Sequence, residues 1–593
     1  DKADVRIHYL QGIDSADTHC GVNGITLGPD GSFYFSEGIF HYTNIESPWG
    51  KPLRAAGPVL YRWNPRTQEF VTHFKISPNP HGTVIDEWGH LFATDGTSGR
   101  GYYVGYPGKG TPHELYKKRV RPVAGFGMIS GTHFPEENRG NLLICNTIGF
   151  LGVLQHKVNI NGADFTSTEV EPILVSSDKN FRPVDVDIGG DGALYVLDWQ
   201  NLIIGHMQHN IRDPNRDHVH GRIYRVTADG RPLTPVVKLA AKPIDNVIAQ
   251  LSSSEHAVRY RARLELSGRD SKKVVEAAQK WARQFDANSL ADAHHLLEAL
   301  WVHEQHNIIN TALLTQLLNS PDPRARAAAT RVLGRRGDRV KNGAVLLQER
   351  ARDTDAHVRA EAVVSAVQFP SLAAAEVIFE ASQRPTDAQL SYVIKQSRTV
   401  LDKYWQDALK NGTKLSPAGQ LFALNRASVQ DLIKMDHTEG VCRALLSRAG
   451  VPRDTRYTAL EDLAKFVKKS IGQTLLDQVD EQSKAKSAAL GDLGDLFSKL
   501  PASDVLAMRK AIITRVSTEG GNAALNSKAA TALIEAGEPA GNLYKQLKKS
   551  DTGKLAFLSI IPKLSDKIRA GLLPTITTII EQEAKRPAPA QTQ

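Results

Sequence analysis

Four stretches of sequence decide the fold, and each is a turn followed by a strand. They are GITLGPDGSFYFSEG (24–38), GTVIDEWGHLFATDG (82–96), HFPEENRGNLLICNT (133–147) and VDIGGDGALYVLDWQ (186–200). Their turn glycines, 58, 51 and 52 residues apart, are Gly31, Gly89, Gly140 and Gly192. A four-stranded propeller blade needs roughly 40 to 50 residues. The spacing therefore predicts β-propeller blades over about residues 1–235.

The strand after each turn is apolar on both faces. The second residue after each glycine is Phe33, Leu91, Leu142 or Leu194, and the third is Tyr34, Phe92, Leu143 or Tyr195. A strand packed between neighbouring blades has this pattern, because neither face meets water. Roughly six to eight blades commonly close a propeller. We therefore expect another segment or chain to supply blades beyond these four, since an open apolar edge aggregates.

From about Pro243 the pattern becomes helical. Three segments match one another: HAVRYRARLELSGRD, PRARAAATRVLGRRGD and AHVRAEAVVSAVQF. Their arginines Arg259, Arg326 and Arg359 each precede an alanine by three residues, and their gaps of 67 and 33 fit one period near 33. Such a period is typical of stacked helix pairs. We predict HEAT-like repeats over 243–400, further helical repeats over 401–584 and a disordered tail over 585–593. The fold class is thus multidomain β + α, an incomplete propeller followed by an α-helical solenoid.

Composition limits the functional classes. The 73 basic residues are interspersed with 64 acidic ones, so the net charge of +9 forms no long basic block, and we do not expect nucleic-acid binding. The sequence contains no apolar run of roughly 18 residues, the length that a membrane-spanning helix needs. Cys20, Cys145 and Cys442 lie far apart and form no zinc signature. A CxxCH motif is also absent, which excludes covalent c-type haem in this chain.

Six residues after each turn glycine stands a polar residue: Glu37, Asp95, Asn146 or Asp198. If these four strands are the innermost of their blades, the side chains converge on the central channel. Carboxylate and amide oxygens are the ligands that calcium prefers. The alternative is that these residues end strands and cap turns, as Asp and Asn often do.

Histidines and an arginine stand near the start of the same repeats: His19, His81, His133 and Arg182. Neutral imidazole is a common general base, and arginine can hold an oxyanion or an acidic cofactor group. A structural role for each is the alternative. The segment from Asp198 to Val226 is also crowded with His, Asp and Arg. There His206 and His209 are candidate metal ligands with Asp198, although Arg–Asp pairs that lock a loop would explain the same composition.

Several of these motifs together resemble a known family. DTHCGVNGITLGPDGSFYFSEGIFH, NPHGTVIDEWGHLFATDG, NFRPVDVDIGGDGALYVLDW and IGHMQHNIRDPNRDHVHGRIYRV are similar to the PVC-type membrane-bound dehydrogenases, whose propeller is akin to that of glucose/sorbosone dehydrogenases. The resemblance covers most of residues 1–235. This family commonly continues into HEAT repeats and often ends in a c-type haem domain. Here the leading blades and the haem motif are absent, and Cys20 stands where a second histidine is expected after His19.

The resemblance implies a periplasmic or extracellular dehydrogenase-like protein that oxidises a sugar or alcohol. It implies pyrroloquinoline quinone held by calcium, His81 as the base and Arg182 as a cofactor or substrate contact. The implied cation ligands are Glu37, Asp95 and Asp198, and we add His19, His133 and Trp199 as candidate cofactor contacts. Electrons would pass to a separate acceptor such as a c-type cytochrome.

Two other functional classes compete with this interpretation. One is a non-catalytic propeller–HEAT scaffold that binds other protein subunits through its helical array. The other is a propeller that binds or cleaves carbohydrate without a redox cofactor. A fold shared with enzymes does not by itself carry their chemistry.

Overall fold

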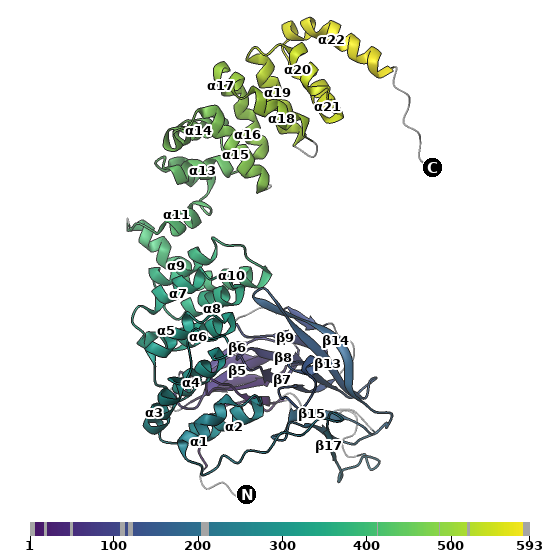
Figure 1. Cartoon of the computed structure of the whole chain (residues 1–593), viewed down its shortest axis with the longest axis vertical. Coiled ribbons are helices and arrows are strands. Elements are labelled where there is room, and N and C mark those ends of the chain that lie inside the picture. The colour runs from purple at the N-terminus through teal and green to yellow at the C-terminus, as the bar shows by residue number, and fades with distance from the viewer. Residues whose placement is uncertain are drawn as a thin grey trace. The chain divides into compact units, whose positions relative to one another are not determined.

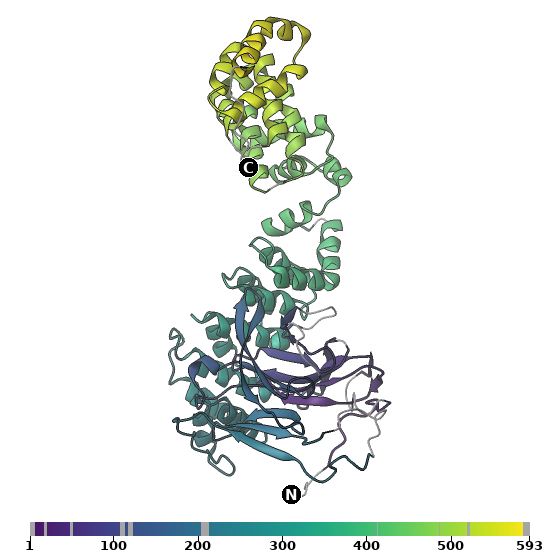
Figure 2. The same ribbon diagram turned by 90° about the vertical axis from the view of Figure 1, so that its right-hand side faces the viewer.

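A computed structural model describes residues 6–16, 21–47, 51–76, 78–106, 113–116, 122–202, 213–411, 413–485, 487–518 and 522–584. The chain divides into two compact units, Asp1–Leu415 and Ser416–Gln593. The first unit contains all the blades and the first ten α-helices, and the second contains only helices (Figures 1 and 2).

Four antiparallel sheets form successive blades, as the sequence predicts. Blade 1 contains β1 (Asn23–Leu27), β2 (Phe33–Glu37), β5 (Val59–Asn64) and β6 (Glu69–Phe74), and blade 2 contains β7 (Pro80–Ile85), β8 (Leu91–Asp95), β9 (Arg100–Tyr103) and β10 (Glu114–Tyr116). Blade 3 contains β11 (Val123–Met128), β12 (Leu142–Asn146), β13 (Gly152–Asn161) and β14 (Asp164–Val175). Blade 4 contains β15 (Pro183–Ile188), β16 (Leu194–Asp198) and β17 (Arg222–Val226), and a hairpin of β3 (Tyr42–Ile45) and β4 (Leu53–Ala56) leaves blade 1. The fold is therefore an incomplete propeller joined to a helical array.

The first strands of the blades, β1, β7, β11 and β15, lie side by side at the centre. Glycine allows this close approach. Gly82 has φ +96°, and a Cβ there would lie 2.9 Å from Phe126 Cβ; at Gly125 it would lie 2.5 Å from the carbonyl oxygen of Val184. The hydroxyl of Thr83 also donates to the carbonyl of Gly24 at 2.7 Å, which joins blades 1 and 2.

The strands that follow the turn glycines are second in their blades, so the prediction that they line the channel is wrong. The repeat seen in the sequence begins at the end of an innermost strand, and the turn carries the chain outward. β2, β8 and β12 are nevertheless almost entirely buried, whereas β16 of the last blade is exposed on one face at Leu197. Burial on both faces therefore does not identify the innermost strand.

The outward face of blade 4 carries exposed apolar side chains. Leu197 on β16 pairs with Ile223 on β17, and these residues are 40% and 70% exposed. The opposite face of the same blade is packed, because Val186, Leu194 and Val196 join the core shared with blade 3. In the described part of the chain no further blade covers Leu197 and Ile223.

Ten α-helices complete the first unit. They are α1 (Ile244–Ala249), α2 (His256–Ser267), α3 (Ser271–Ala282), α4 (Ala293–Gln305), α5 (Thr311–Leu318), α6 (Pro323–Arg336), α7 (Gly343–Ala351), α8 (Ala356–Ala366), α9 (Leu372–Ala381) and α10 (Ala388–Lys410). The repeated arginines stabilise successive pairs: Arg326 donates to Asp353 at 2.7 Å, and Arg359 donates to the carbonyl of Asp353 at 2.9 Å. The alanines beside them are buried where α6 packs on α8.

This helical array lies along the turn ends of the blades (Figure 1). Arg335 of α6 forms an ion pair of 3.0 Å with Asp30 in the first turn of blade 1. Arg331, one helical turn earlier, donates to the carbonyl of Gly89 in blade 2 at 2.8 Å. Two of the turn glycines that reveal the repeat in the sequence, Gly31 and Gly89, thus also lie in the contact surface for the helices.

The second unit contains the remaining helices. They are α11 (Pro417–Leu424), α12 (Val429–Lys434), α13 (Glu439–Ser447), α14 (Arg453–Val467), α15 (Ile471–Lys484), α16 (Leu490–Gly494), α17 (Ala502–Ala507), α18 (Arg509–Ser517), α19 (Ala523–Glu535), α20 (Ala540–Leu547), α21 (Asp551–Ile560) and α22 (Asp566–Ala584). One apolar cluster runs through the unit from Leu432 to Leu572. In the described part of either unit, no helix combines the length and apolarity needed to cross a membrane.

Candidate functional site

The four innermost strands surround a cavity of about 650 Å³, which we call the axial groove. Its walls are Gly24–Thr26 of β1, His81–Ile85 of β7, Ala124–Met128 of β11 and Val184–Ile188 of β15. Helix α2 closes one end. A concave site at the axis of a propeller, lined by several blades, is a usual place for a small-molecule ligand.

Three titratable side chains of the blades face this groove. His81 comes from β7, and Asp185 and Asp187 come from β15, where their spacing of two places both on one face of the strand. Burial lowers the pKa of His81, although the Asp185 carboxylate opposes this shift. The pKa of Asp185 and that of Asp187 are raised, mainly by burial. The groove thus brings together a neutral imidazole and a carboxylate that can stabilise its protonated form.

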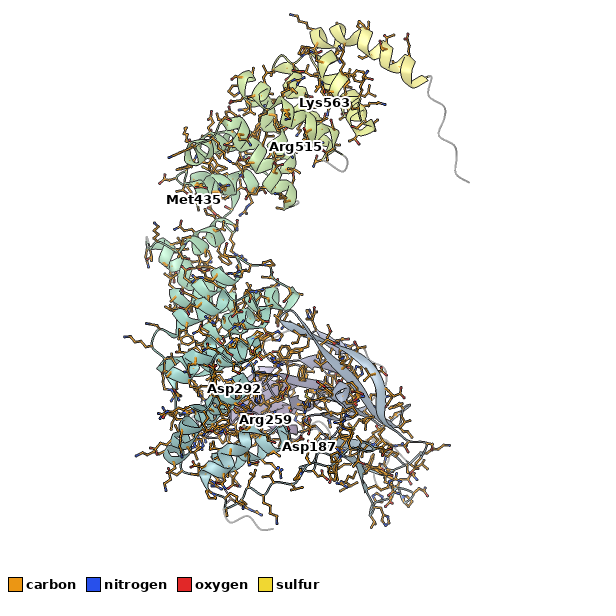
Figure 3. The ribbon with its side chains drawn as sticks, in the orientation of Figure 1. Asp187, Arg259, Asp292, Met435, Arg515 and Lys563 are labelled. Carbon is orange, nitrogen blue, oxygen red and sulfur yellow. The ribbon has the colours of Figure 1, made fainter. Side chains whose placement is uncertain are left out.

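Helix α2 brings three polar side chains to the closed end of the groove: His256, Tyr260 and Arg261. Burial lowers the pKa of His256 to about 3, so this imidazole is neutral at neutral pH. The pKa of Tyr260 is raised by burial and also by Asp187. Figure 3 labels Asp187 on the blade side and Arg259 of the same helix on the helical side. The site therefore combines blade and helix residues from one compact unit.

The four residues first proposed as calcium ligands do not line the axial groove. Each is buried at the C-terminal end of the second strand of its blade and makes hydrogen bonds within that blade. Glu37 accepts hydrogen bonds from Thr43 at 2.8 Å and Tyr61 at 2.7 Å. Because these partners belong to blade 1, Glu37 stabilises that blade and is not directed at a shared axial ion.

The equivalent residues in the other blades attach the second strand to the residue just before the first. Asp95 accepts from the backbone N–H of Asn79 at 3.2 Å, and Asp198 accepts from that of Arg182 at 2.7 Å. The amide of Asn146 donates to the carbonyl of Pro122 at 3.4 Å. The repeated polar register is thus a repeated structural cap, the alternative that the sequence left open.

Three further candidates lie outside the groove lining. His133 is buried and accepts a hydrogen bond from Ala228 N–H through Nε2 at 2.9 Å, so its Nδ1 donates to the carbonyl of Pro232 at 3.0 Å. Arg182 is buried and donates to the carbonyl of Phe181 at 2.9 Å. Trp199 is partly exposed beside Arg216, whose guanidinium carbon is 5.9 Å from the ring centroid. His133 and Arg182 thus bond to backbone groups of the propeller, and the cofactor and catalytic roles expected for them stay predictions.

His19, His206 and His209 lie outside the described residues. Among the residues that the structure does describe, no group of three or more His, Cys, Asp or Glu side chains is arranged to hold a metal ion. Asp198, which was proposed as a metal ligand together with His206 and His209, instead forms an ion pair of 2.6 Å with Arg222.

Sequence reasoning found His81 but missed Asp185 and Asp187. The signal for them was present, because VDVDI places two acidic residues on one face of an otherwise apolar strand. Tyr260 and Arg261 carried no comparable signal. Only the contact between the helical array and the turn ends of the blades brings α2 to the groove.

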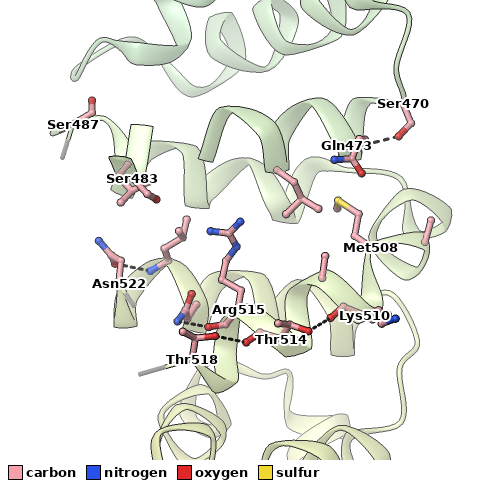
Figure 4. A pocket seen from close by; sticks show the side chains of 16 residues that line it. Ser470, Gln473, Ser483, Ser487, Met508, Lys510, Thr514, Arg515, Thr518 and Asn522 are labelled. Atoms are coloured by element: carbon pink, nitrogen blue, oxygen red, sulfur yellow. Dashed lines mark hydrogen bonds between the residues drawn. The ribbon is translucent and has the colours of Figure 1, made fainter. Parts of the chain in front are cut away.

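A second hollow lies in the helical unit, with a volume of about 1150 Å³. Helices α15, α18 and α19 supply most of its walls, with hydroxyl and amide groups such as Ser470, Gln473, Thr514 and Asn522 (Figure 4). Arg515 also lines it and is paired with Asp480. No titratable pair comparable to His81 and Asp185 lines this hollow.

Comparisons with known proteins agree with the two-part architecture. Residues 1–118 and 109–230 match the model of a domain of unknown function (DUF7133), and residues 311–397 match HEAT repeats. A solved structure described as a "putative gluconolactonase" is 13% identical, with 38% of this chain and 82% of that chain covered and a TM-score of 0.19. No curated protein matches the chain. The chain is thus similar to these families over parts of its length.

Proposed function

We propose that the axial groove binds a small hydroxylated molecule, a sugar or an alcohol, and that His81 removes a proton from it during oxidation. The protein would then be a dehydrogenase-like protein of the PVC type, periplasmic or extracellular, that passes electrons to a separate acceptor. The observation that carries this proposal is the position of His81 opposite Asp185 in a groove walled by four blades.

The chemistry of the two side chains supports this role. The lowered pKa of His81 leaves its imidazole neutral at neutral pH and able to accept a proton. Asp185 would stabilise the imidazolium that forms. A correctly placed general base contributes roughly 10²- to 10⁴-fold to a rate.

Calcium and pyrroloquinoline quinone remain predictions from the family resemblance. The residues first assigned to calcium are engaged inside their blades, and they do not fit a shared cation site at the axis. The axial groove offers two carboxylates and Arg261 as its charged groups among the described residues.

The test is oxidation of a panel of aldoses and alcohols with an electron-accepting dye, with and without calcium and pyrroloquinoline quinone. We expect His81→Ala to lower the rate at least about 100-fold. His220→Ala is the matched control, because this histidine is exposed outside the groove, and it should retain activity. An inactive wild-type protein that also binds no sugar or alcohol would overturn the proposal.

A second candidate function is a scaffold that binds other protein subunits. The exposed pair Leu197 and Ile223 on blade 4 and the polar hollow of the second unit support it. Native mass spectrometry of the protein isolated from its source separates the two functions. A stoichiometric hetero-assembly with an inert groove supports the scaffold, whereas turnover in the absence of a partner supports the enzyme.

A further inference from the structure

A cavity of about 430 Å³ lies where the end of α6 meets blade 1, separate from the axial groove. Thr67 of the β5–β6 turn stands on the propeller side. Arg335 and Arg336 end α6, and Arg339 follows in the next turn. Asn307 and Gln368 complete the polar lining. We call this space the arginine cavity.

The three arginines differ in their partners. Arg335 is paired with Asp30 at 3.0 Å and stands 3.6 Å from Glu304. Arg339 donates to the carbonyl of Asn307 at 3.0 Å and to its side-chain oxygen at 2.8 Å. Arg336 is only 7% exposed, and its Nε is buried without a hydrogen-bond partner among the described residues. Arg336 is therefore a buried cation with an unpartnered Nε, and Glu304 is a nearby acidic side chain whose charge interacts with it.

A buried guanidinium without a counter-ion is costly. Removing one partner of a buried ion pair typically costs about 3 to 5 kcal/mol, because the remaining charge is uncompensated. The described acidic groups whose charges act on these arginines include Asp30, Glu304 and Glu361. Asp30 faces both Arg335 and Arg62, and burial raises the pKa of Glu304. Among the described residues that line the cavity itself there are three arginines and no carboxylate, and this lining favours an anion.

The shape and chemistry of the lining indicate which anion fits. Guanidinium groups are planar hydrogen-bond donors that match phosphate oxygens, and Gln368 and Thr67 add neutral donors. A volume of about 430 Å³ is within the range of small-molecule pockets and larger than a single inorganic ion requires.

We propose that the arginine cavity binds the phosphate group of a small phosphorylated molecule, with Arg336 as its anchor. The ligand bridges the propeller and the helical array at blade 1. This binding is independent of any reaction in the axial groove, so the failure of either proposal leaves the other standing.

The experiment measures the thermal midpoint and calorimetric binding of the full chain at constant ionic strength. The probes are inorganic phosphate and glycerol 3-phosphate, and glycerol and acetate serve as matched ligands without phosphate. We expect both phosphates to bind and to raise the midpoint, since a ligand of the native state stabilises it. Glycerol 3-phosphate should bind more tightly because it fills more of the cavity.

Arg336→Gln is the decisive variant. It removes a buried guanidinium whose Nε has no hydrogen-bond partner among the described residues, so we expect the phosphate-free protein to be about as stable as wild type, and phosphate affinity to fall at least about tenfold. Arg352→Gln is the matched control, because Arg352 is half-exposed and paired with Glu380, and it should bind phosphate as wild type does. Absence of phosphate binding, equal binding of acetate, or unchanged affinity in Arg336→Gln would each overturn the proposal.

Discussion

The two units both stack helices, but they bury different chemistry. The first unit buries histidines and ion pairs, such as His73, His357 and the Arg263–Glu298 pair at 2.6 Å. The second unit is built on one apolar cluster, and its largest buried polar side chain is Arg456. That arginine donates mostly to backbone carbonyls, including Leu446 at 3.1 Å.

The difference follows from what the helices contact. Helices of the first unit pack against blade turns, whose carbonyls and carboxylates need donors, and Arg331 and Arg335 meet that need. Helices of the second unit pack on one another, and apolar side chains suffice for that. Buried charged side chains are therefore concentrated where the helices contact the blade turns. Each of the following experiments tests this comparison.

The largest expected effect is acid destabilisation confined to the first unit. Burial lowers the pKa of His73, His256 and His357 to about 3, whereas the ordinary value is 6.5. The unfolded chain therefore binds more protons, and stability is lost as the pH falls from about 6.5 toward 3. Each histidine contributes a slope of about 1.4 kcal/mol per pH unit in that window.

Hydrogen exchange at pH 7 and pH 5 would measure this effect separately in the two units. The only histidine of the second unit is His437, which is partly exposed, so exchange there should change little. His357→Phe should reduce the pH dependence of the first unit. Equal acid sensitivity in both units would contradict the comparison.

A smaller effect is expected when the buried ion-pair cluster of α2 and α4 is broken. Glu298 is 1% exposed and lies 3.2 Å from Arg259 and 2.6 Å from Arg263. Glu298→Ala leaves the buried guanidinium of Arg263 unpaired and leaves Arg259 with Glu87 alone, and we expect a loss of about 3 to 5 kcal/mol in the free energy of unfolding. Denaturant titration measures it. Glu439→Ala, which breaks an exposed pair with Arg443 in the second unit, should cost less than about 1 kcal/mol.

A third experiment tests the close approach of the innermost strands. Gly82→Ala places a Cβ 2.9 Å from Phe126 Cβ in a left-handed backbone region, and we expect a loss of about 1 to 3 kcal/mol. Gly140→Ala is the matched control, since Gly140 also has positive φ but opens onto free space. The difference between the two variants isolates the steric part. Equal losses would mean that backbone strain alone is responsible.

The smallest expected effect concerns helix caps, which the two units share. Asp355 accepts from the backbone N–H of His357 at the start of α8, and Ser470 accepts from that of Gln473 at the start of α15. Replacing either by alanine should cost about 1 kcal/mol. Unfolding curves of the two variants would test this similarity. A much larger loss at Asp355 would show that the blades depend on this helix end.

Local patterns predicted much of the architecture. The turn glycines located four blades, and the spacing of Arg259, Arg326 and Arg359 located the helical repeats. The order of strands inside a blade was not predictable, because the second strands β2, β8 and β12 are buried on both faces, as an innermost strand was expected to be. That one error placed Glu37 and its counterparts at the axis.

The candidate site was predicted only in part, for a related reason. His81 was found because the family resemblance points to the His-Gly segment that precedes a turn of the repeat, and the structure places this residue within β7. Tyr260 and Arg261 reach the groove from a helix about 180 residues later in the chain, and no local pattern encodes that contact. Contacts of this kind follow from the packing of the helical array against the blades.

The attachment of the helical array to the blade turns has a mechanical consequence. Arg331 and Arg335 lie one turn apart on α6 and contact the turns of blades 2 and 1, so this helix spaces the two blades at their turn ends. Both blades also wall the axial groove, and a tilt of α6 would change its width. A molecule whose binding tilted α6 would therefore be thermodynamically linked to whatever the groove holds, and each would alter the affinity of the other by the same factor.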